Sequence, residues 1–261
     1  ERRSEGRERR KQVPRSSHAA WAPAPDSFDP AALVDADNAG RLPWLVPIRH
    51  GRMSASAFAF YRGTAAIMAA DLATGPSTGM KVQLCGDAHL SNFGGYSAPD
   101  RRLVFDINDF DETHPGPWEW DVKRLAASFV LAGRHRGFAA GASVRAARRS
   151  VLAYREAMAG FAEARTLDIW YSRIEADDLL ARVPADLQRR VRKQTRAARS
   201  RDNLQAFRKL AEEVDGVARI RSDPPVVVPM RDVPDPRSTE ELMASVAHVL
   251  TSYRATLATD R

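Results

Sequence analysis

Only two short stretches of this sequence have the pattern of β-strands, and each leads directly into polar residues. Residues 81–87 (KVQLCGD) are a short, mostly apolar run that ends in Gly-Asp, the form of a buried strand that enters a loop. Residues 101–109 (RRLVFDIND) form a second such run, and the segment YSAPDRR between them carries a Pro-Asp turn signal. The sequence therefore predicts a small β-hairpin that carries the polar residues.

Helical patterns surround this hairpin. Before it, a short helix and then an extended, proline-punctuated segment are expected within residues 29–53, followed by one helix over residues 54–73. After a loop at residues 115–117, a helix is expected to begin at Asp121 and to end at Gly137. Further helical patterns cover residues 141–166, 177–183, 185–213 and 238–257. The predicted fold class is α+β and mostly helical.

Four segments are expected along the chain. Residues 1–25 begin with a run of charged side chains and are expected to be a disordered basic tail. Residues 26–220 form the main domain. Residues 221–238 contain five prolines, which exclude a helix and predict an extended linker. Residues 239–261 then form a C-terminal helix.

The composition excludes some classes of protein and locations. Hydrophobic residues make up 44% and charged residues 28% of the chain, as is ordinary for a globular protein in water. No apolar run approaches the ~20 residues that a membrane-spanning helix needs, so no membrane partner is expected. The charged N-terminus is not a signal peptide. The single cysteine, Cys85, excludes an internal disulfide and fits a reducing cytosol, so a cytoplasmic location is expected.

The net charge of +7 raises the question of a nucleic-acid partner. The excess of basic residues lies in the N-terminal tail and in residues 187–210, where arginines recur at spacings of three and four: Arg189, Arg192, Arg196 and Arg199. Such a stripe more often forms a solvated helix face than a binding surface. A nucleic-acid partner is left open, but it is not the favoured interpretation.

The polar residues near the hairpin suggest metal chemistry. Asp87 and Asn92 lie five residues apart in a loop that follows a strand, where catalytic side chains are often found. The segment FDINDFDE places four acidic residues within seven positions: Asp106, Asp109, Asp111 and Glu112. Like charges this close repel one another unless water or a cation screens them. Carboxylate and amide oxygens are ligands that Mg²⁺ accepts, together with waters and a substrate phosphate.

The strand is expected to end before these acids. In a continuous strand, Asp109 and Asp111 would share a face with the apolar residues Phe105 and Ile107. The strand is therefore predicted to break near Asn108, which frees the two carboxylates to turn toward the loop at Asp87.

The spacing of these residues resembles that of kinases. A kinase catalytic loop has an aspartate base and, five residues later, a metal-binding asparagine, and Asp87 and Asn92 repeat that step. The ordered set CGDAHLSN, NDFDE, GP and DVKRLA resembles the aminoglycoside phosphotransferase and choline kinase branch, whose pattern reads hGDxHxxN, IDFDD, GP and DLA. This resemblance implies a kinase-like C-lobe in which the hairpin carries the catalytic loop, with Mg²⁺ and ATP as cofactors.

A closer resemblance covers about residues 45–135. The segments GRMSASAFAFYRGTAAIMAADLA, VQLCGDAHLSNFG, FDINDFDET and GPWEWDVKRLAAS are similar to the signature of an uncharacterised bacterial domain-of-unknown-function family, DUF2252. Members of that family are considered kinase-like and carry a glycine-rich segment and a lysine-bearing strand farther downstream. The chain ends at Arg261 before any such segment, so the resemblance implies a partial chain whose nucleotide lobe is missing or truncated.

Several neighbouring residues have two interpretations each. His89 is expected to orient the loop by hydrogen bonding rather than to bind metal, since no second His or Cys has ligand spacing. Asp121 is expected to be a helix N-cap or a buried brace for the catalytic loop, in either case with a structural role. Lys123 and Arg124 could contact phosphate or lie on an exposed helix face. Arg62 and Gly63 stand inside an apolar helical pattern; the family resemblance implies a phosphate role for them, which the residues by themselves do not derive.

The expected function is a Mg²⁺- and ATP-dependent phosphotransferase. In it Asp87 is the base, and Asn92, Asp109 and Asp111 hold the metal, with Asp106 as an assisting residue. The phosphate acceptor, a small molecule or a protein, is not identified. Because the chain has no GxGxxG loop and no lysine in a suitable strand, it could be inactive as it stands. A non-catalytic kinase-like binding module and a DxD nucleotide-sugar transferase are the alternatives.

Overall fold

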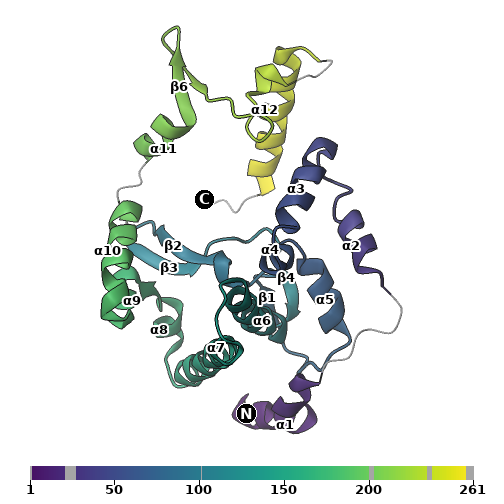
Figure 1. Ribbon diagram of the computed structural model, residues 1–261, viewed down its shortest axis with the longest axis vertical. Coiled ribbons are helices and arrows are strands. Elements are labelled where there is room, and N and C mark those ends of the chain that lie inside the picture. Colours follow the sequence, from purple (N-terminus) through teal and green to yellow (C-terminus); the bar gives the residue numbers. More distant parts are fainter. Residues whose placement is uncertain (1, 21–27, 101, 200–202, 234–236, 257–261) are drawn as a thin grey trace. The chain divides into compact units, whose positions relative to one another are not determined.

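The computed structural model describes residues 2–20, 28–100, 102–199, 203–233 and 237–256 (Figure 1). The chain divides into two compact units, residues 1–200 and residues 201–261, which are described separately. The fold is α+β and about 59% helical, with small antiparallel sheets, which confirms the predicted class. Within the described ranges, no helix has the length and apolar character required to cross a membrane.

The N-terminal residues form helices where the sequence predicts disorder. Helix α1 spans Arg2–Gln12, and the short 3₁₀ helix η1 spans Arg15–Ala19. Glu5 and Arg9 form an ion pair of 2.8 Å, one helical turn apart on α1. Arg9 Nη1 also donates a hydrogen bond of 2.7 Å to the carbonyl oxygen of Thr78. A local ion pair and a distant backbone contact thus stabilise a segment that has little apolar surface. Residues 21–25 of the predicted tail lie outside the described residues.

Between η1 and the first strand, the described residues form five more short helices: α2 (Pro30–Ala36), η2 (Pro43–Leu45), α3 (Val46–Met53), α4 (Ala57–Arg62) and α5 (Ala65–Ala73). Two expectations are wrong here. The segment expected to be extended contains α3, because Pro47 stands in its first turn, where a missing N–H costs nothing. The single helix predicted over residues 54–73 is broken at Gly63 and Thr64. Arg49 Nη2 donates to the carbonyl oxygen of Gly63 at 2.9 Å, and a continuous helix would have used that oxygen internally.

The strands pair differently from the prediction. Strand β1 (Lys81–Leu84) pairs antiparallel with β4 (His114–Pro117), in the segment expected to be a loop. Strand β2 (Phe93–Ser97) forms the hairpin with β3 (Leu103–Ile107), and β3 also pairs with the two-residue β5 (Ile174–Glu175). Residues 81–87 and residues 101–109 are therefore not hairpin partners.

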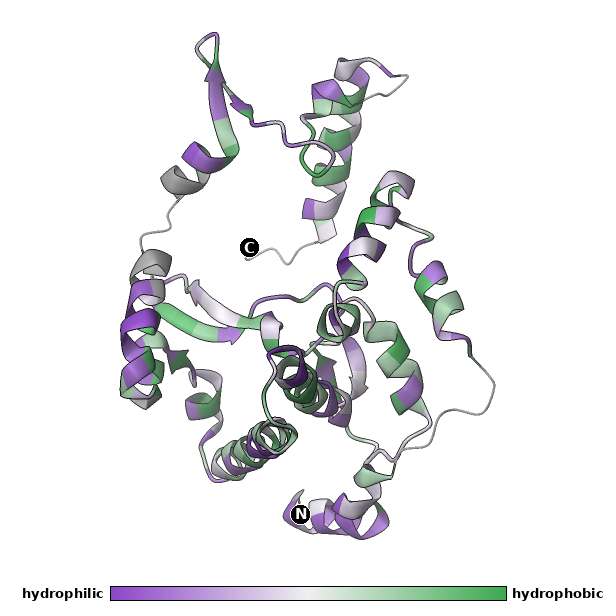
Figure 2. Cartoon of the chain, in the orientation of Figure 1, coloured by the Kyte–Doolittle hydropathy of each residue, from purple (hydrophilic) through white to green (hydrophobic). Residues whose placement is uncertain are grey.

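The reason for this error lies in the chain between the two predicted strands. A 3₁₀ turn, η3 (Leu90–Asn92), follows Asp87 and leads directly into Phe93–Ser97, which is the segment that pairs with β3. Strand β2 reads FGGYS, and its two glycines weaken the strand signal; in Figure 2 this strand is pale, whereas β3 is largely coloured as hydrophobic. Strand β4 contains two prolines, which the edge of a two-stranded sheet tolerates. Of the four residues of β1 only Leu84 is buried, so β1 is not the buried strand that was expected.

Helix α6 (Glu119–His135) is the centre of the first unit. It packs along α7 (Ala140–Phe161) and also contacts α4 and α5 (Figure 1). Its end near Gly137, which has a φ of +73°, agrees with the predicted C-terminus. The remaining helices of the unit are α8 (Thr166–Trp170), α9 (Ala176–Arg182) and α10 (Ala185–Arg199). Arg189 and Arg192 are exposed on α10, whereas the side chains of Arg196 and Arg199 lie outside the described residues.

The second unit contains a hairpin where the sequence predicts a helix. Helix α11 (Asn203–Leu210) leads into β6 (Ala211–Val214), which pairs with β7 (Val217–Ile220); η4 (Met230–Asp232) and α12 (Thr239–Thr256) follow. Asp215 and Gly216 connect the two strands with φ values of 54° and 75°. An Asp-Gly pair with positive φ at both positions is a favoured hairpin turn, so the helix predicted over 185–213 is wrong at its C-terminal end.

Candidate active site

The loop that follows β1 is held in one conformation by its own hydrogen bonds. The main-chain N–H of His89 donates to the carbonyl oxygen of Asp87 at 2.7 Å, and that of Asn92 donates to the carbonyl oxygen of His89 at 2.9 Å. His89 Nδ1 accepts a hydrogen bond from the N–H of Ser91 at 3.1 Å. Ser128 Oγ on α6 accepts from the N–H of Leu90 at 3.0 Å. The loop is therefore anchored to α6 through Leu90, and His89, which is 2% exposed, fixes the shape of the loop itself.

Asn92 is oriented by Asp87. Its Nδ2 donates to the main-chain oxygen of Asp87 at 2.8 Å and lies 3.4 Å from Oδ2 of the same residue. The Asn92 side chain is buried. With Nδ2 used in this way, Oδ1 is the atom of Asn92 that remains available to a ligand.

The carboxylate of Asp87 forms an ion pair with a buried arginine. Arg124 Nε donates to Asp87 Oδ1 at 2.5 Å, and His89 Nε2 lies 3.3 Å from Oδ2. The side chains of Arg124 and Asp87 are only 3% and 14% exposed. Arg124 is thus neither a free phosphate ligand nor part of an exposed helix face. It fixes the orientation of the Asp87 carboxylate, whose other oxygen, Oδ2, lies near His89 and Asn92.

Tyr61 holds Arg124 from the other side. The guanidinium carbon of Arg124 lies 4.4 Å from the centre of the Tyr61 ring, and Nη2 donates to the carbonyl oxygen of Tyr61 at 2.8 Å. The Tyr61 hydroxyl donates in turn to the carbonyl oxygen of Arg124 at 2.8 Å and lies 3.0 Å from Met68 Sδ. Burial raises the pKa of Tyr61 well above its usual range, so the phenol stays a neutral donor.

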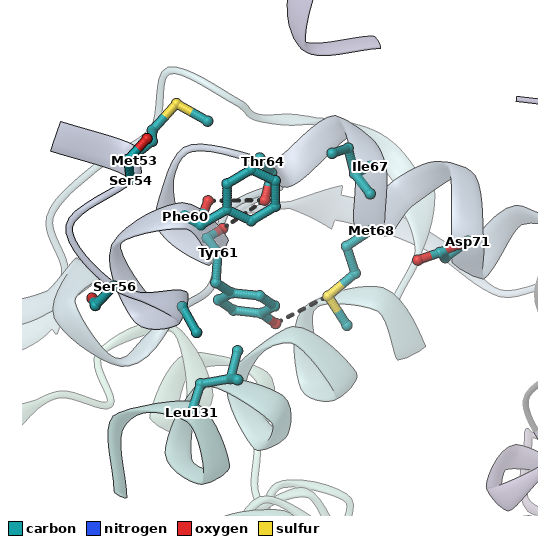
Figure 3. Close-up of a pocket in the computed structure, with 11 residues that line it drawn as sticks. Met53, Ser54, Ser56, Phe60, Tyr61, Thr64, Ile67, Met68, Asp71 and Leu131 are labelled. Atoms are coloured by element: carbon teal, nitrogen blue, oxygen red, sulfur yellow. Dashed lines mark hydrogen bonds between the residues drawn. The ribbon is translucent and has the colours of Figure 1, made fainter. Parts of the chain in front are cut away.

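An apolar cavity of about 590 Å³ lies beside Tyr61 (Figure 3). Figure 3 shows Tyr61 between Met68 on α5 and Leu131 on α6. Thr64, Ile67, Met68 and Asp71 line this cavity at helical spacing, and Ala65 and Ala66 line the polar pocket described below. Helix α5 therefore separates an apolar cavity from a polar one, and Tyr61 connects the first to the Arg124–Asp87 pair.

The acidic segment approaches the loop from β3. Strand β3 ends at Ile107, which agrees with the predicted break near Asn108. The N–H of Asn108 donates to the carbonyl oxygen of Asn92 at 3.0 Å, and Cys85 Sγ lies 3.7 Å from the carbonyl oxygen of Asp109. These two contacts place Asp109 next to the loop that carries Asp87.

Gly86 permits the closest approach between the two motifs. Its φ is +81°, and a Cβ at this position would lie 1.9 Å from the carbonyl oxygen of Glu112. Only glycine fits both the backbone conformation and the space. The glycine before Asp87 is therefore required by the packing of the acidic segment against the loop.

Asp121 braces the start of the loop. Its carboxylate accepts hydrogen bonds from the N–H groups of Cys85, at 2.8 Å, and of Gly86, at 3.1 Å. Asp121 lies inside α6 and the N-cap position is Trp118, so the N-cap interpretation is wrong. Burial raises the pKa of Asp121, and the two backbone donors oppose that shift.

A polar pocket of about 200 Å³ brings most of the predicted site together. Five of the predicted site residues line it, namely Asp87, His89, Asn92, Asp109 and Asp111, together with Glu112 of the same acidic segment. The others do not. Asp106 is exposed and accepts a hydrogen bond from the N–H of Ile107. Lys123 lies on α6 and does not line the pocket. Arg124 and Asp121 contact the loop, through Asp87 and Cys85, without lining the pocket.

The donor atoms of the pocket fit Mg²⁺. Partial burial raises the pKa of Asp111, and the nearby charge of Asp109 raises it further. Burial, followed by the charge of Asp111, likewise raises the pKa of Glu112. A cation would relieve this repulsion, and the oxygens of Asp109, Asp111 and Asn92 are hard ligands. In the described ranges no three His, Cys, Asp or Glu side chains form a group that could hold a metal ion by themselves.

Four charged lining residues were not assigned to this site from the sequence: Asp37, Arg41, Arg49 and Arg62. They come from the turn after α2, from α3 and from the end of α4, at least 25 positions before Asp87 along the chain. No local pattern connects them with the acidic motifs. Arg62 was noted only through the family resemblance, inside a helix that the structure ends at this residue.

Comparison with known proteins identifies a family and no characterised relative. No curated protein and no solved structure matches the chain. The family model described as "Uncharacterized protein conserved in bacteria (DUF2252)" matches residues 41–261, a span that contains all the pocket residues except Asp37. The chain therefore belongs to the DUF2252 family of uncharacterised conserved bacterial proteins.

Proposed function

We propose that the chain is a Mg²⁺- and ATP-dependent phosphotransferase with a kinase-like C-lobe. The observation that carries the proposal is the convergence of Asp87, Asn92, Asp109 and Asp111 on one polar pocket. Phosphoryl transfer depends mainly on positioning and charge neutralisation, for which an oriented carboxylate and a metal-binding oxygen set are the main requirements. The five-residue step from Asp87 to Asn92 is the one found in kinase catalytic loops.

Asp87 is the proposed base. Arg124 binds Oδ1, so the carboxylate is fixed and Oδ2 can accept a hydrogen bond from the hydroxyl group of the acceptor. In this proposal Asp87 aligns that hydroxyl and takes its proton as the new O–P bond forms, while the bond between the γ-phosphorus and the β,γ-bridging oxygen of ATP breaks and ADP leaves. Tyr61 and Arg124 act as positioning residues, because they touch Asp87 or its partner and not the pocket.

Asn92, Asp109 and Asp111 are the proposed metal ligands. When bound, Mg²⁺ neutralises the oxygens of the transferred phosphoryl group. The chain supplies the geometry for this: Asp87 holds Asn92 by its Nδ2, and the contact between Asn108 and Asn92 holds the acidic segment beside it. Asp106, which the sequence suggested as an assisting residue, is outside the pocket and has no part in the proposal.

Nucleotide binding tests the proposal. Isothermal titration of the full chain with ATP, with and without Mg²⁺, should show binding that depends on the metal. Asp109→Asn should lose this binding. Asp106→Asn is the matched control, because it removes a carboxylate three residues away that does not line the pocket. Asp87→Asn should keep Mg²⁺-dependent ATP binding and lose phosphoryl transfer to water or to added acceptors.

Two results would contradict the proposal. A preference for Mn²⁺ with a nucleotide sugar would favour the DxD transferase, in which Asp109 and Asp111 hold the metal and the diphosphate. The lack of any metal-dependent ligand would favour a non-catalytic binding module. The cytoplasmic location and the acceptor remain expectations outside this test.

A further inference from the structure

The polar pocket has a basic side as well as an acidic side. Its acidic side comes from residues 87–112, whereas its basic side comes from Arg41, Arg49 and Arg62, which precede α5. The three arginines differ in how their guanidinium groups are used, and this difference decides what each can do.

Arg49 is bound within the protein through both of its terminal nitrogens. Its Nη1 donates to Asn38 Oδ1 at 2.8 Å, and its Nη2 donates to Asp37 Oδ2 at 2.7 Å and to the carbonyl oxygen of Gly63 at 2.9 Å. Its side chain is 17% exposed. Arg49 therefore ties the turn after α2 to the end of α4, and it fixes the place of the neighbouring Arg62.

Arg62 is exposed, lines the pocket and makes no side-chain hydrogen bond or ion pair with any part of the chain that the structure describes. Arg41 is partly used: its Nε donates to the carbonyl oxygen of Asp37 at 3.1 Å, and one Nη lies 3.7 Å from the Asp37 carboxylate. The other N–H groups of Arg41 are free to bind a ligand. The pocket thus presents one unused guanidinium and one half-used guanidinium opposite its carboxylates.

This arrangement fits a ligand that contains both a cation and an anion. Asp37 is paired with Arg49, and Asp87 is paired with Arg124, so Asp109, Asp111 and Glu112 remain as the unpaired carboxylates. A divalent cation on that side and an anion at Arg62 would balance the charges of the pocket. A planar guanidinium binds phosphate oxygens through two parallel N–H groups, which makes arginine well suited to this role.

The pocket also contains no lysine. In characterised kinases a lysine and a glycine-rich loop hold the nucleotide phosphates, and none of the described pocket residues is a lysine. The first residues of α5, Ala65 and Ala66, line the pocket beside Arg62, so the positive end of that helix adds to the same field.

We propose that Arg62, assisted by Arg41, binds the phosphate chain of a metal-bound nucleoside polyphosphate, with Arg49 as the positioning residue. This assignment rests on the proposed phosphotransferase function and names the group that takes the place of the kinase lysine. No covalent step is attributed to either arginine. Their role is to bind and orient the polyphosphate against Asp109 and Asp111.

The test compares Arg62→Gln with a matched control, Arg52→Gln. Arg52 is an exposed arginine on α3 that does not line the pocket and makes no side-chain hydrogen bond with a described residue. Isothermal titration of the full chain with Mg²⁺ alone, with Mg²⁺·ATP and with Mg²⁺ plus tripolyphosphate gives three separate affinities. For Arg62→Gln we expect unchanged Mg²⁺ affinity and roughly 10- to 100-fold weaker binding of both polyphosphates. Arg62→Lys should recover part of the loss, and Arg52→Gln should match the wild-type protein.

The outcomes separate this inference from the proposed function. If the wild-type protein binds tripolyphosphate through Arg62 but shows no ATP-dependent transfer, the subsite stands and the phosphotransferase proposal fails. If Arg62→Gln binds Mg²⁺·ATP as tightly as the wild-type protein does, the subsite is wrong although the phosphotransferase stands. Lack of polyphosphate binding by the wild-type protein, or an equal loss in Arg52→Gln, would also overturn the subsite.

Discussion

Replacing Arg124 by methionine is expected to destabilise the first unit by roughly 3–5 kcal/mol. The substitution leaves the Asp87 carboxylate, which is 14% exposed, without its main cationic partner. It also removes the contact of the guanidinium with the Tyr61 ring and the hydrogen bond to the carbonyl oxygen of Tyr61. His89 Nε2 and Asn92 Nδ2 still lie 3.3 Å and 3.4 Å from Asp87 Oδ2 and keep part of its charge compensated. We therefore expect the loss of stability to fall in the lower part of that range.

A double-mutant cycle measures how much of this loss belongs to the ion pair. Asp87→Asn in the Arg124→Met background removes the unpaired charge, so the double variant should be more stable than the sum of the single effects predicts, by about 2 kcal/mol. Urea unfolding followed by tryptophan fluorescence suits the measurement, because all five tryptophans lie in residues 1–200. Arg136→Met, at an exposed arginine just after α6, is the control.

The reasoning would be refuted by either of two results. Arg124→Met with a stability within ~0.5 kcal/mol of the wild-type value, the usual range for surface substitutions, would show that the pair is not buried in solution. Additive single effects would show that Arg124 stabilises the protein through Tyr61 alone and does not position Asp87.

Three further predictions concern the same loop. Gly86→Ala should unfold the loop or destabilise the protein by well over 1 kcal/mol in urea unfolding. The control, Gly137→Ala, has a similar positive φ and no atom near its Cβ, so it should cost only about 1 kcal/mol. Equal losses of stability would contradict the close approach of Gly86 to Glu112. Burial raises the pKa of Cys85 to about 11, so at pH 8 roughly one thiol in a thousand is ionised. A thiol reagent should therefore react slowly with the native protein and rapidly with the protein unfolded in urea. Equal reaction rates would argue against the buried position of Cys85. Asp111→Asn should raise the thermal midpoint of the metal-free protein, because the raised pKa of Asp111 in the folded state means that its ionised form opposes folding at neutral pH. The same substitution should abolish the stabilisation by Mg²⁺ that we expect in a melting assay, and an unchanged Mg²⁺ effect would exclude Asp111 as a ligand.

Local sequence determined the parts of the site that depend on neighbouring residues. The apolar run before Gly-Asp predicted where β1 ends, and the alternation of apolar and acidic residues predicted that β3 ends before Asn108. The C-terminal glycine predicted the end of α6. These features follow from backbone preferences and from the cost of burying a charge, and both can be read within a few residues.

Tertiary structure decided which segments meet. The pairing of β1 with β4, and of β2 with β3, depends on the turn after Asp87, because the glycine-rich β2 and the proline-containing β4 have weak strand signals of their own. The break between α4 and α5 depends on a hydrogen bond from Arg49, which comes from another helix. Sequence periodicity does not contain information about a donor that arrives from elsewhere in the chain.

The candidate site divides along the same line. The acidic side of the pocket lies within residues 87–112, and the sequence predicted Asp87, Asn92, Asp109 and Asp111 as one site from their spacing and from the family resemblance. The contact itself depends on the pairing of β2 with β3, which the sequence did not predict. The basic side comes from residues 41–62, and only the packing of α3 and α4 against the loop places those guanidinium groups opposite the carboxylates. Arginine charges are ordinary on helix surfaces, and they acquire a specific partner only when folding brings a distant segment to them.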